Sequence, residues 1–173
     1  KSNSTDYSID DAMDQVRNSP NDSNAHFNLG RAYLLSGQYR KAMTSFKDTI
    51  KINSDDALAN FGIGTSYIML GEYQESVPFF KKAIQINPNL AISHEELGRS
   101  YSALGKHQKA IKSLKEAIRL KPNSAEAYFS LGKAYNNNSQ FLEGIFSLKE
   151  GLRLQPGLAS AHMELGFSYS NLK

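Results

Sequence analysis

A period of 34 residues runs through most of the chain without an insertion or a deletion. Rows that start at residues 23, 57, 91, 125 and 159 carry a large aliphatic residue at the seventh place and glycine at the eighth: Leu29-Gly30, Ile63-Gly64, Leu97-Gly98, Leu131-Gly132 and Leu165-Gly166. The eleventh place is tyrosine in every row: Tyr33, Tyr67, Tyr101, Tyr135 and Tyr169. Self-similarity at such a period indicates a repeat architecture, in which each repeat is one supersecondary unit.

The apolar residues inside each row are spaced as on α-helices. Glycine turns near residues 37, 71 and 105 divide a row into two helices, and Asn-Pro near residue 87 ends a second helix because the residue before proline avoids the helical region. We therefore expect helices at 23–36, 40–52, 57–70, 74–86, 91–104, 108–120, 125–138, 142–154 and 159–172, after a lone second helix in the stretch from Tyr7 to Val16.

The composition favours the same fold class. Val occurs only twice, against 16 Ala and 18 Leu, which disfavours a sheet and favours helices.

The order Leu-Gly-x-x-Tyr, then Gly-x-Tyr, Ala, Phe and Pro at these places, resembles the tetratricopeptide repeat. The resemblance covers residues 23–173 and implies an all-α, right-handed superhelical solenoid of helix-turn-helix repeats. It also implies a concave groove, lined by the first helices, that binds peptides or protein segments. On this basis we divide the chain into an N-terminal half-repeat or capping helix, four complete repeats and the first helix of a fifth: 1–22, 23–56, 57–90, 91–124, 125–158 and 159–173.

The groove places of the family can be transferred onto this chain row by row. In the family the second, fifth, ninth, twelfth and thirteenth places of the first helix tend to face inward, and the sixth often contributes. The candidate partner-binding residues are then Phe27, Asn28, Arg31, Leu58, Phe61, Thr65, Ile68, Ile92, Glu95, Glu96, Arg99, Phe129 and Lys133.

This candidate groove is apolar in its first two rows and polar in the next two. Contiguous exposed apolar surface usually marks an interaction site, although some of these residues could instead pack between helices or hold the N-terminal helix. If the groove reading is right, Phe61→Glu abolishes binding with little change in melting temperature.

Two known uses of the family fit this chain poorly. A clamp for a two-carboxylate peptide end has Lys and Asn at the fifth and ninth places, where the first row has Phe27 and Arg31. Glutamates such as Glu96 would repel a carboxylate. A ladder of asparagines at the sixth place is reduced to Asn28.

Residues that could carry chemistry are not clustered in the sequence. The chain has no Cys, so it has no disulfide, thiolate ligand or cysteine nucleophile. His26, His94 and His162 recur two rows apart, and helices two repeats apart are separated by roughly 20 Å, too far to share one metal ion. We therefore expect no metal, no cofactor and no catalytic residue, and we predict a non-catalytic protein–protein interaction scaffold.

Nucleic acid is a weaker candidate for the partner. The net charge of +3 is too small for bulk electrostatic binding to dominate. Residues 106–121 carry six basic side chains against the single acid Glu116, and such a helix can hold phosphates. A solvated outer surface is the commoner explanation, so we do not expect nucleic acid to be the partner.

Two alternatives concern the wider context of these repeats. The chain could be a targeting or regulatory segment of a larger multidomain protein or enzyme. The helix expected at 159–172 has a full first-helix pattern, and exposed Leu165 and Tyr169 would let this end continue into further chain or associate with a second copy. No apolar run is long enough to span a membrane, and a chain without Cys fits any compartment, with the cytoplasm slightly favoured.

The fourth row departs from the pattern. Asn136-Asn137-Asn138-Ser139 replaces the glycine turn, and Gly144 and Gly151 stand inside the second helix. Each such glycine costs about 0.5–1 kcal/mol relative to Ala, so the helix at 142–154 is predicted to be the least stable of the complete repeats.

Overall fold

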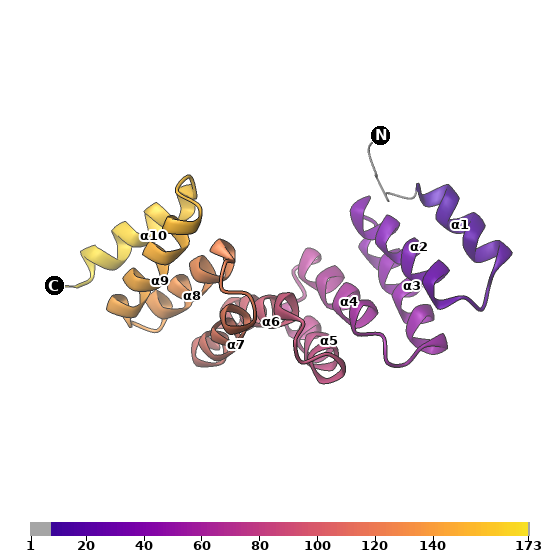
Figure 1. The fold of residues 1–173 in the computed structure, drawn as a ribbon, viewed down its shortest axis with the longest axis horizontal. Helices are drawn as coiled ribbons and strands as arrows, with labels where there is room; N and C mark the ends of the chain where they lie inside the picture. The colour runs from indigo at the N-terminus through magenta and orange to yellow at the C-terminus, as the bar shows by residue number, and fades with distance from the viewer. Residues whose placement is uncertain (1–7, 173) are drawn as a thin grey trace. The chain divides into compact units, whose positions relative to one another are not determined.

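The structure, a computed structural model, describes residues 8–172, and within that range it contains ten α-helices and no strand (Figure 1). The helices are α1 (Ile9–Asn18), α2 (Ser23–Leu35), α3 (Tyr39–Ile52), α4 (Ala57–Met69), α5 (Tyr73–Ile86), α6 (Ala91–Ala103), α7 (His107–Leu120), α8 (Ala125–Asn137), α9 (Phe141–Leu154) and α10 (Ala159–Ser170). The all-α class is confirmed, and the expected helix ends differ from these by one or two residues. Residues 1–7 of the half-repeat expected at 1–22, and Lys173, lie outside the described range.

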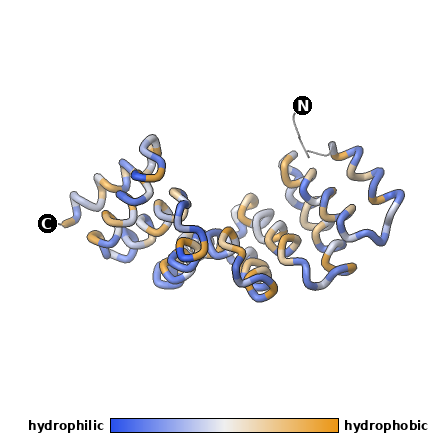
Figure 2. The backbone as a smooth tube through the Cα atoms, in the orientation of Figure 1, coloured by the Kyte–Doolittle hydropathy of each residue, from blue (hydrophilic) through white to orange (hydrophobic). Residues whose placement is uncertain are grey.

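The chain divides into two compact units, residues 1–88 with α1–α5 and residues 89–173 with α6–α10. In the first unit α2 pairs with α3 and α4 with α5, while α1 packs on α2. In the second unit α6 pairs with α7 and α8 with α9, while α10 packs on both α8 and α9. Hydrophobic and hydrophilic residues alternate along the helices (Figure 2). Stacking therefore buries apolar faces that a single repeat would leave in water.

The eighth-place glycines permit the close approach of paired helices. The buried rings of Phe46 in α3 and Phe80 in α5 lie against Gly30 in α2 and Gly64 in α4, respectively, and a β-carbon at either glycine would overlap the ring. In the second unit Leu114 lies against Gly98 in the same way. A large second-helix side chain thus fills the space that a first-helix glycine leaves open.

The turns inside the repeats use the left-handed region of the backbone. Gly37, Gly71 and Gly105 have φ values of +77°, +77° and +69°. Ser139 occupies the equivalent place in the fourth repeat with φ of +60°. A residue with a β-carbon is strained there, so the missing glycine of the fourth row changes the energy of the turn and not its geometry.

Candidate partner-binding surface

The face of the first helices that carries the candidate residues, named here the first-helix face, holds two aromatic residues in the first unit. Phe27 of α2 and Phe61 of α4 are half-buried. Their ring centroids lie 5.6 Å from Phe46 and 5.8 Å from Phe80, respectively, in tilted arrangements. Both rings therefore contribute to the core as well as to the surface, and Phe61→Glu cannot separate a loss of binding from a loss of stability.

Aliphatic side chains make up most of the exposed apolar part of this face in the first unit. Leu35, Leu58 and Met69 are 70%, 49% and 53% exposed. Ile68 is half-buried and Arg31 is exposed beside them. Exposed large apolar residues on one side of α2 and α4 are expected of a binding surface rather than of a solvated one.

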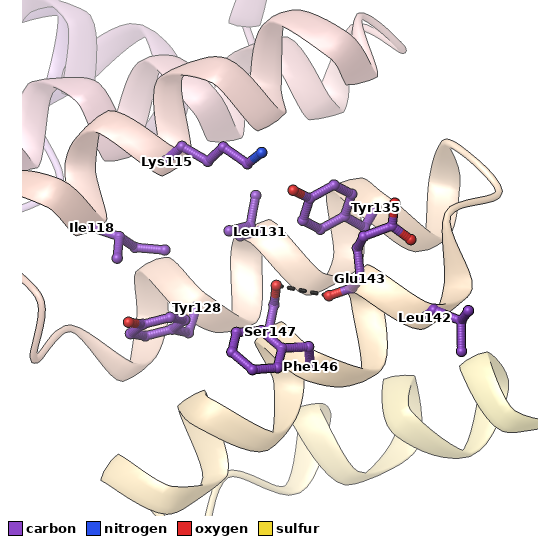
Figure 3. Close-up of a pocket in the computed structure, with 9 residues that line it drawn as sticks. All are labelled: Lys115, Ile118, Tyr128, Leu131, Tyr135, Leu142, Glu143, Phe146 and Ser147. Atoms are coloured by element: carbon purple, nitrogen blue, oxygen red, sulfur yellow. Dashed lines mark hydrogen bonds between the residues drawn. The ribbon is translucent and has the colours of Figure 1, made fainter.

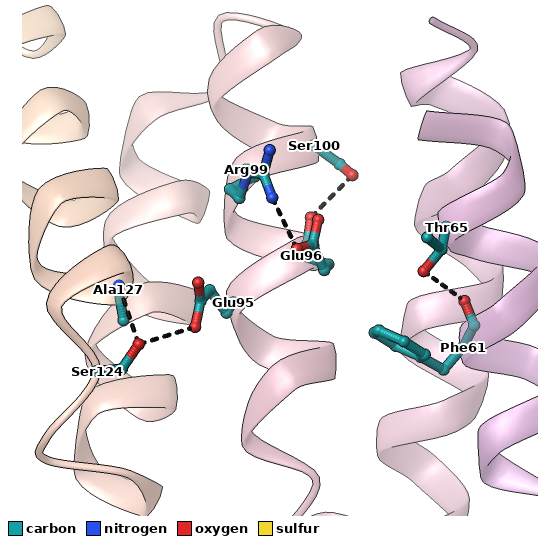
Figure 4. Close-up of polar contacts among 8 residues, drawn as sticks. All are labelled: Phe61, Thr65, Glu95, Glu96, Arg99, Ser100, Ser124 and Ala127. Atoms are coloured by element: carbon teal, nitrogen blue, oxygen red, sulfur yellow. Dashed lines mark hydrogen bonds and ion pairs between the residues drawn. The ribbon is translucent and has the colours of Figure 1, made fainter. Parts of the chain in front are cut away.

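Two candidates in the first unit have partners within the chain. The Asn28 amide donates a hydrogen bond to Gln15 Oε1 of α1 at 3.3 Å, so this residue helps to hold the N-terminal helix. The Thr65 hydroxyl donates to the carbonyl oxygen of Phe61 at 3.0 Å (Figure 4). Neither polar group is wholly free for a partner.

Three of the four polar candidates of the second unit, Glu95, Glu96 and Arg99, lie on α6 (Figure 4), and the fourth, Lys133, lies on α8. Glu95 is only 8% exposed and accepts a hydrogen bond from Ser124 Oγ at 3.3 Å, while that hydroxyl accepts one from the amide N–H of Ala127. Burial raises the pKa of the Glu95 carboxyl, and the negative charge of Glu96 raises it further. Glu95 therefore supports the start of α8 more than it faces solvent.

The other two polar candidates of α6 form a pair. Arg99 Nη1 lies 2.8 Å from Glu96 Oε1, and the arginine side chain is 53% exposed against 12% for the glutamate. Burial raises the pKa of the Glu96 carboxyl, and the Arg99 charge opposes that rise. A partner would thus meet the guanidinium first, with exposed Ile92 on the same helix.

A hollow of about 480 Å³ lies on the first-helix face between α8 and α10. We name it the inner hollow; it is lined by Phe129, Lys133, Asn137, Ser160, Met163, Glu164 and Phe167. Met163 and Phe167 are 77% and 50% exposed. The structure therefore brings the candidates Phe129 and Lys133 together with apolar residues of α10.

Sequence reasoning missed Met163 and Phe167, although the signal was present. They hold the fifth and ninth places of the fifth row, the places that Phe129 and Lys133 hold in the fourth. Extending the groove places into the fifth row finds both.

Two of the four histidines bond to the loop that precedes their helix. Nε2 of His26 lies 2.9 Å from the carbonyl oxygen of Pro20, and Nε2 of His162 lies 3.0 Å from that of Pro156. A carbonyl oxygen only accepts, so each ring donates and ties its helix to the preceding loop. Among residues 8–172, no three His, Asp or Glu side chains are grouped so that they could hold a metal ion.

Each helix within residues 8–172 lacks the length or the apolar character that is needed to cross a bilayer.

Family models cover most of the chain. Models described as tetratricopeptide repeat match residues 16–44, 57–90, 79–112 and 125–158, and one described as TPR repeat matches residues 98–139. No protein of curated function gave a match.

Several solved structures have a similar fold. A crystal structure of MamA is 27% identical, with 86% of this chain and 81% of that chain covered and a TM-score of 0.77. MamA 41-end from Desulfovibrio magneticus RS-1 is 24% identical, with coverage of 86% and 84% and a TM-score of 0.80. YrrB, described as a TPR protein with an unusual peptide-binding site, is 16% identical, with coverage of 90% and 80% and a TM-score of 0.77.

Proposed function

The chain belongs to the tetratricopeptide repeat family, and from this premise we propose that it is a non-catalytic scaffold that binds a peptide or protein segment on its first-helix face. The observation that carries the proposal is the inner hollow, whose lining includes exposed Met163 and Phe167 together with Lys133. The peptide-binding site named for YrrB, which has a similar fold, is consistent with it.

The distribution of exposed apolar residues supports the same face. Six of the large apolar side chains that are exposed stand at groove places of the first helices: Leu35, Leu58, Met69, Ile92, Met163 and Phe167. Burial of such side chains against a partner releases about 25 cal/mol per Å² of apolar surface. The basic side chains on the first helices, Arg31, Arg99 and Lys133, would favour a segment that also carries acidic or carbonyl groups.

The proposal is tested by selecting short random peptides on the whole chain and measuring their affinity for surface variants. Met163→Glu places a charge in the inner hollow at a side chain that is 77% exposed, so folding is little affected. We expect it to weaken the selected peptides at least about tenfold, which corresponds to roughly 1.4 kcal/mol.

Ile52→Glu is the matched control, because Ile52 is 43% exposed at the end of α3 and away from the first-helix face. It should leave the affinities within about twofold. Equal binding by wild type and Met163→Glu, or an equal loss in the control, would count against the proposed face.

A second candidate function is self-association through α10. A β-carbon at Gly98 or Gly132 would meet Leu114 or Leu148, whereas at Gly166 of α10 nothing lies within 4 Å. Tyr169 on the same helix is 48% exposed, while Leu165 is half-buried and not exposed as its place in the row suggested. An uncovered helix face of this kind can accept a helix from a second copy.

Sedimentation velocity tests this second candidate. Self-association predicts a sedimentation coefficient that rises with protein concentration and a smaller rise for Tyr169→Lys. A single concentration-independent monomer would exclude it.

A further inference from the structure

A second hollow, of about 500 Å³, lies in the second unit between α7 and α9. We name it the outer hollow (Figure 3). Its floor is the side of α8 that carries Tyr128, Leu131 and Tyr135, and Leu142 and Phe146 of α9 stand at its edge.

The outer and inner hollows lie on opposite sides of α8. Tyr128, Leu131 and Tyr135 face the outer hollow, whereas Phe129 and Lys133 face the inner one. At 100° per residue these two sets point about half a turn apart. The outer hollow is therefore separate from the first-helix face on which the proposed function rests.

The first unit contains a hollow at the equivalent position of its own repeat, and the edge of that hollow is polar. That hollow, of about 300 Å³, lies between α1 and α3 and is lined by Val16, His26, Leu29, Tyr33, Lys41, Thr44, Ser45 and Asp48. All of these residues except Asp48 stand at the same row places as lining residues of the outer hollow, with Thr44 in the place of Phe146. The hollow is thus a property of the fold, but its apolar edge belongs to the fourth repeat.

Leu142 and Phe146 are larger or more apolar than the residues that the other repeats carry at the same places. The place of Phe146 is held by Thr44, Pro78 and Lys112 in the other rows, and the place of Leu142 by Arg40, Gln74 and Gln108. Leu142 and Phe146 are each 68% exposed. At that exposure they contribute little to the core, so packing does not account for their apolar character.

The helix on the other side of the outer hollow is basic. α7 exposes Lys109, Lys112 and Lys115, and its one acid, Glu116, is paired with Arg119 at 2.7 Å. The ammonium of Lys115 lies 5.6 Å from the centroid of the Tyr135 ring, at the edge of the hollow. The apolar edge therefore shares the hollow with the ammonium group of Lys115, on a helix that exposes two further lysines.

We propose that the outer hollow is a second docking site, which binds an acidic amphipathic peptide. The apolar side chains of the peptide pack against Leu142 and Phe146, and one of its carboxylates meets Lys115. A concave surface suits a peptide, which can enter it, better than the flat surface of a bilayer. Nucleic acid would meet the lysines but would leave the apolar edge without a role.

The test is a differential selection of random peptides on the whole chain. The variant Leu142→Gln/Phe146→Thr carries the residues that other repeats have at these places, and both side chains are exposed, so it should fold and melt like wild type. We expect peptides that bind wild type but bind this variant at least about tenfold more weakly. Their sequences should combine aliphatic or aromatic residues with Asp and Glu.

Two further variants make each outcome decisive. Lys115→Glu should weaken the same peptides, whereas Met163→Glu should leave them unchanged, which separates this site from the inner hollow. The proposal is overturned if no peptide distinguishes wild type from the edge variant, or if the distinguishing peptides lack acidic residues. Vesicles of phosphatidylcholine and phosphatidylserine are the last arm, and sedimentation of the chain with them that depends on Leu142 and Phe146 would assign the site to a membrane surface instead.

Discussion

The side-chain oxygen of Asn136 in α8 lies directly against Gly144 in α9, where a β-carbon would overlap it. That oxygen accepts a hydrogen bond from Ser168 Oγ at 2.8 Å, and the Asn136 amide nitrogen donates to the carbonyl oxygen of Glu164 at 3.2 Å. Asn136 is 3% exposed and so joins α8 to α10 inside the second unit. Gly144 makes room for this buried amide.

Gly144→Ala is therefore expected to destabilise the protein, although helix propensity alone would favour Ala by about 1 kcal/mol. The added methyl group forces Asn136 to move and weakens its hydrogen bonds to α10, each worth about 1 kcal/mol. We expect a net loss of about 1–2 kcal/mol in the free energy of unfolding, measured by urea denaturation.

The third repeat supplies the control for this substitution, because it has Ser102 and Ala110 at the two places. In an Asn136→Ser background, Gly144→Ala should cost less or become stabilising, and the double-mutant cycle should show coupling of at least about 0.5 kcal/mol. Additive effects would mean that the two residues do not depend on each other.

Ser139→Gly is expected to stabilise the protein by about 1 kcal/mol, because Ser139 has φ of +60° and glycine adopts that region without strain. The matched reverse change is Gly105→Ser, at a glycine with φ of +69° and no atom within 4 Å of an added β-carbon. It should lower stability by a similar amount, since only the backbone conformation opposes it. Opposite shifts in melting temperature support this assignment, and shifts of the same sign contradict it.

Glu95→Gln is expected to raise the melting temperature at pH 7. Burial and the neighbouring Glu96 raise the pKa of Glu95 in the folded state, so the charged carboxylate destabilises the fold. The stability contribution of Glu95 is present below its unfolded pKa of 4.5 and is lost as the pH rises through its higher folded pKa. Gln keeps an oxygen that accepts from Ser124 and carries no charge.

The pH dependence supplies the check on Glu95. The difference in melting temperature between Glu95→Gln and wild type should shrink towards zero below about pH 4, where both side chains are neutral. Glu75→Gln, at an exposed glutamate of α5, is the control for a general change of charge. A difference that persists unchanged into acid would show that the effect does not come from the Glu95 charge.

The positions of the helices could be predicted from the sequence because residues that contact each other within a repeat recur at fixed places of the row. Leu29, Gly30 and Tyr33 recur since the same helix pair is built each time. The role of Gly144 could not be predicted from the row pattern. Its contact residue Asn136 lies on another helix and is itself an exception, because the third row has Ser102 at that place. The lower stability of α9 inferred from its glycines stays a prediction.

The surroundings of the candidate binding residues were predicted less completely than the fold. Family places locate which side of a first helix faces the groove, but not whether a side chain there is already used. Asn28 is bonded to α1 and Glu95 to Ser124, contacts that depend on the particular neighbours and not on the row pattern. The outer hollow needed the structure as well, because Leu142 and Phe146 gain meaning only from their exposure beside α7.

The most direct test of the proposed function is a methyl NMR titration of the whole chain with a peptide whose binding Met163→Glu weakens. Binding at this face predicts that the Met163 methyl resonance, in the inner hollow, shifts when the peptide is added, together with methyl groups of the first-helix face in the same unit, such as those of Ile92. The Leu142 methyl groups at the outer hollow should stay in place. Shifts confined to residues off the first-helix face, with the Met163 resonance unchanged, would contradict binding at this face.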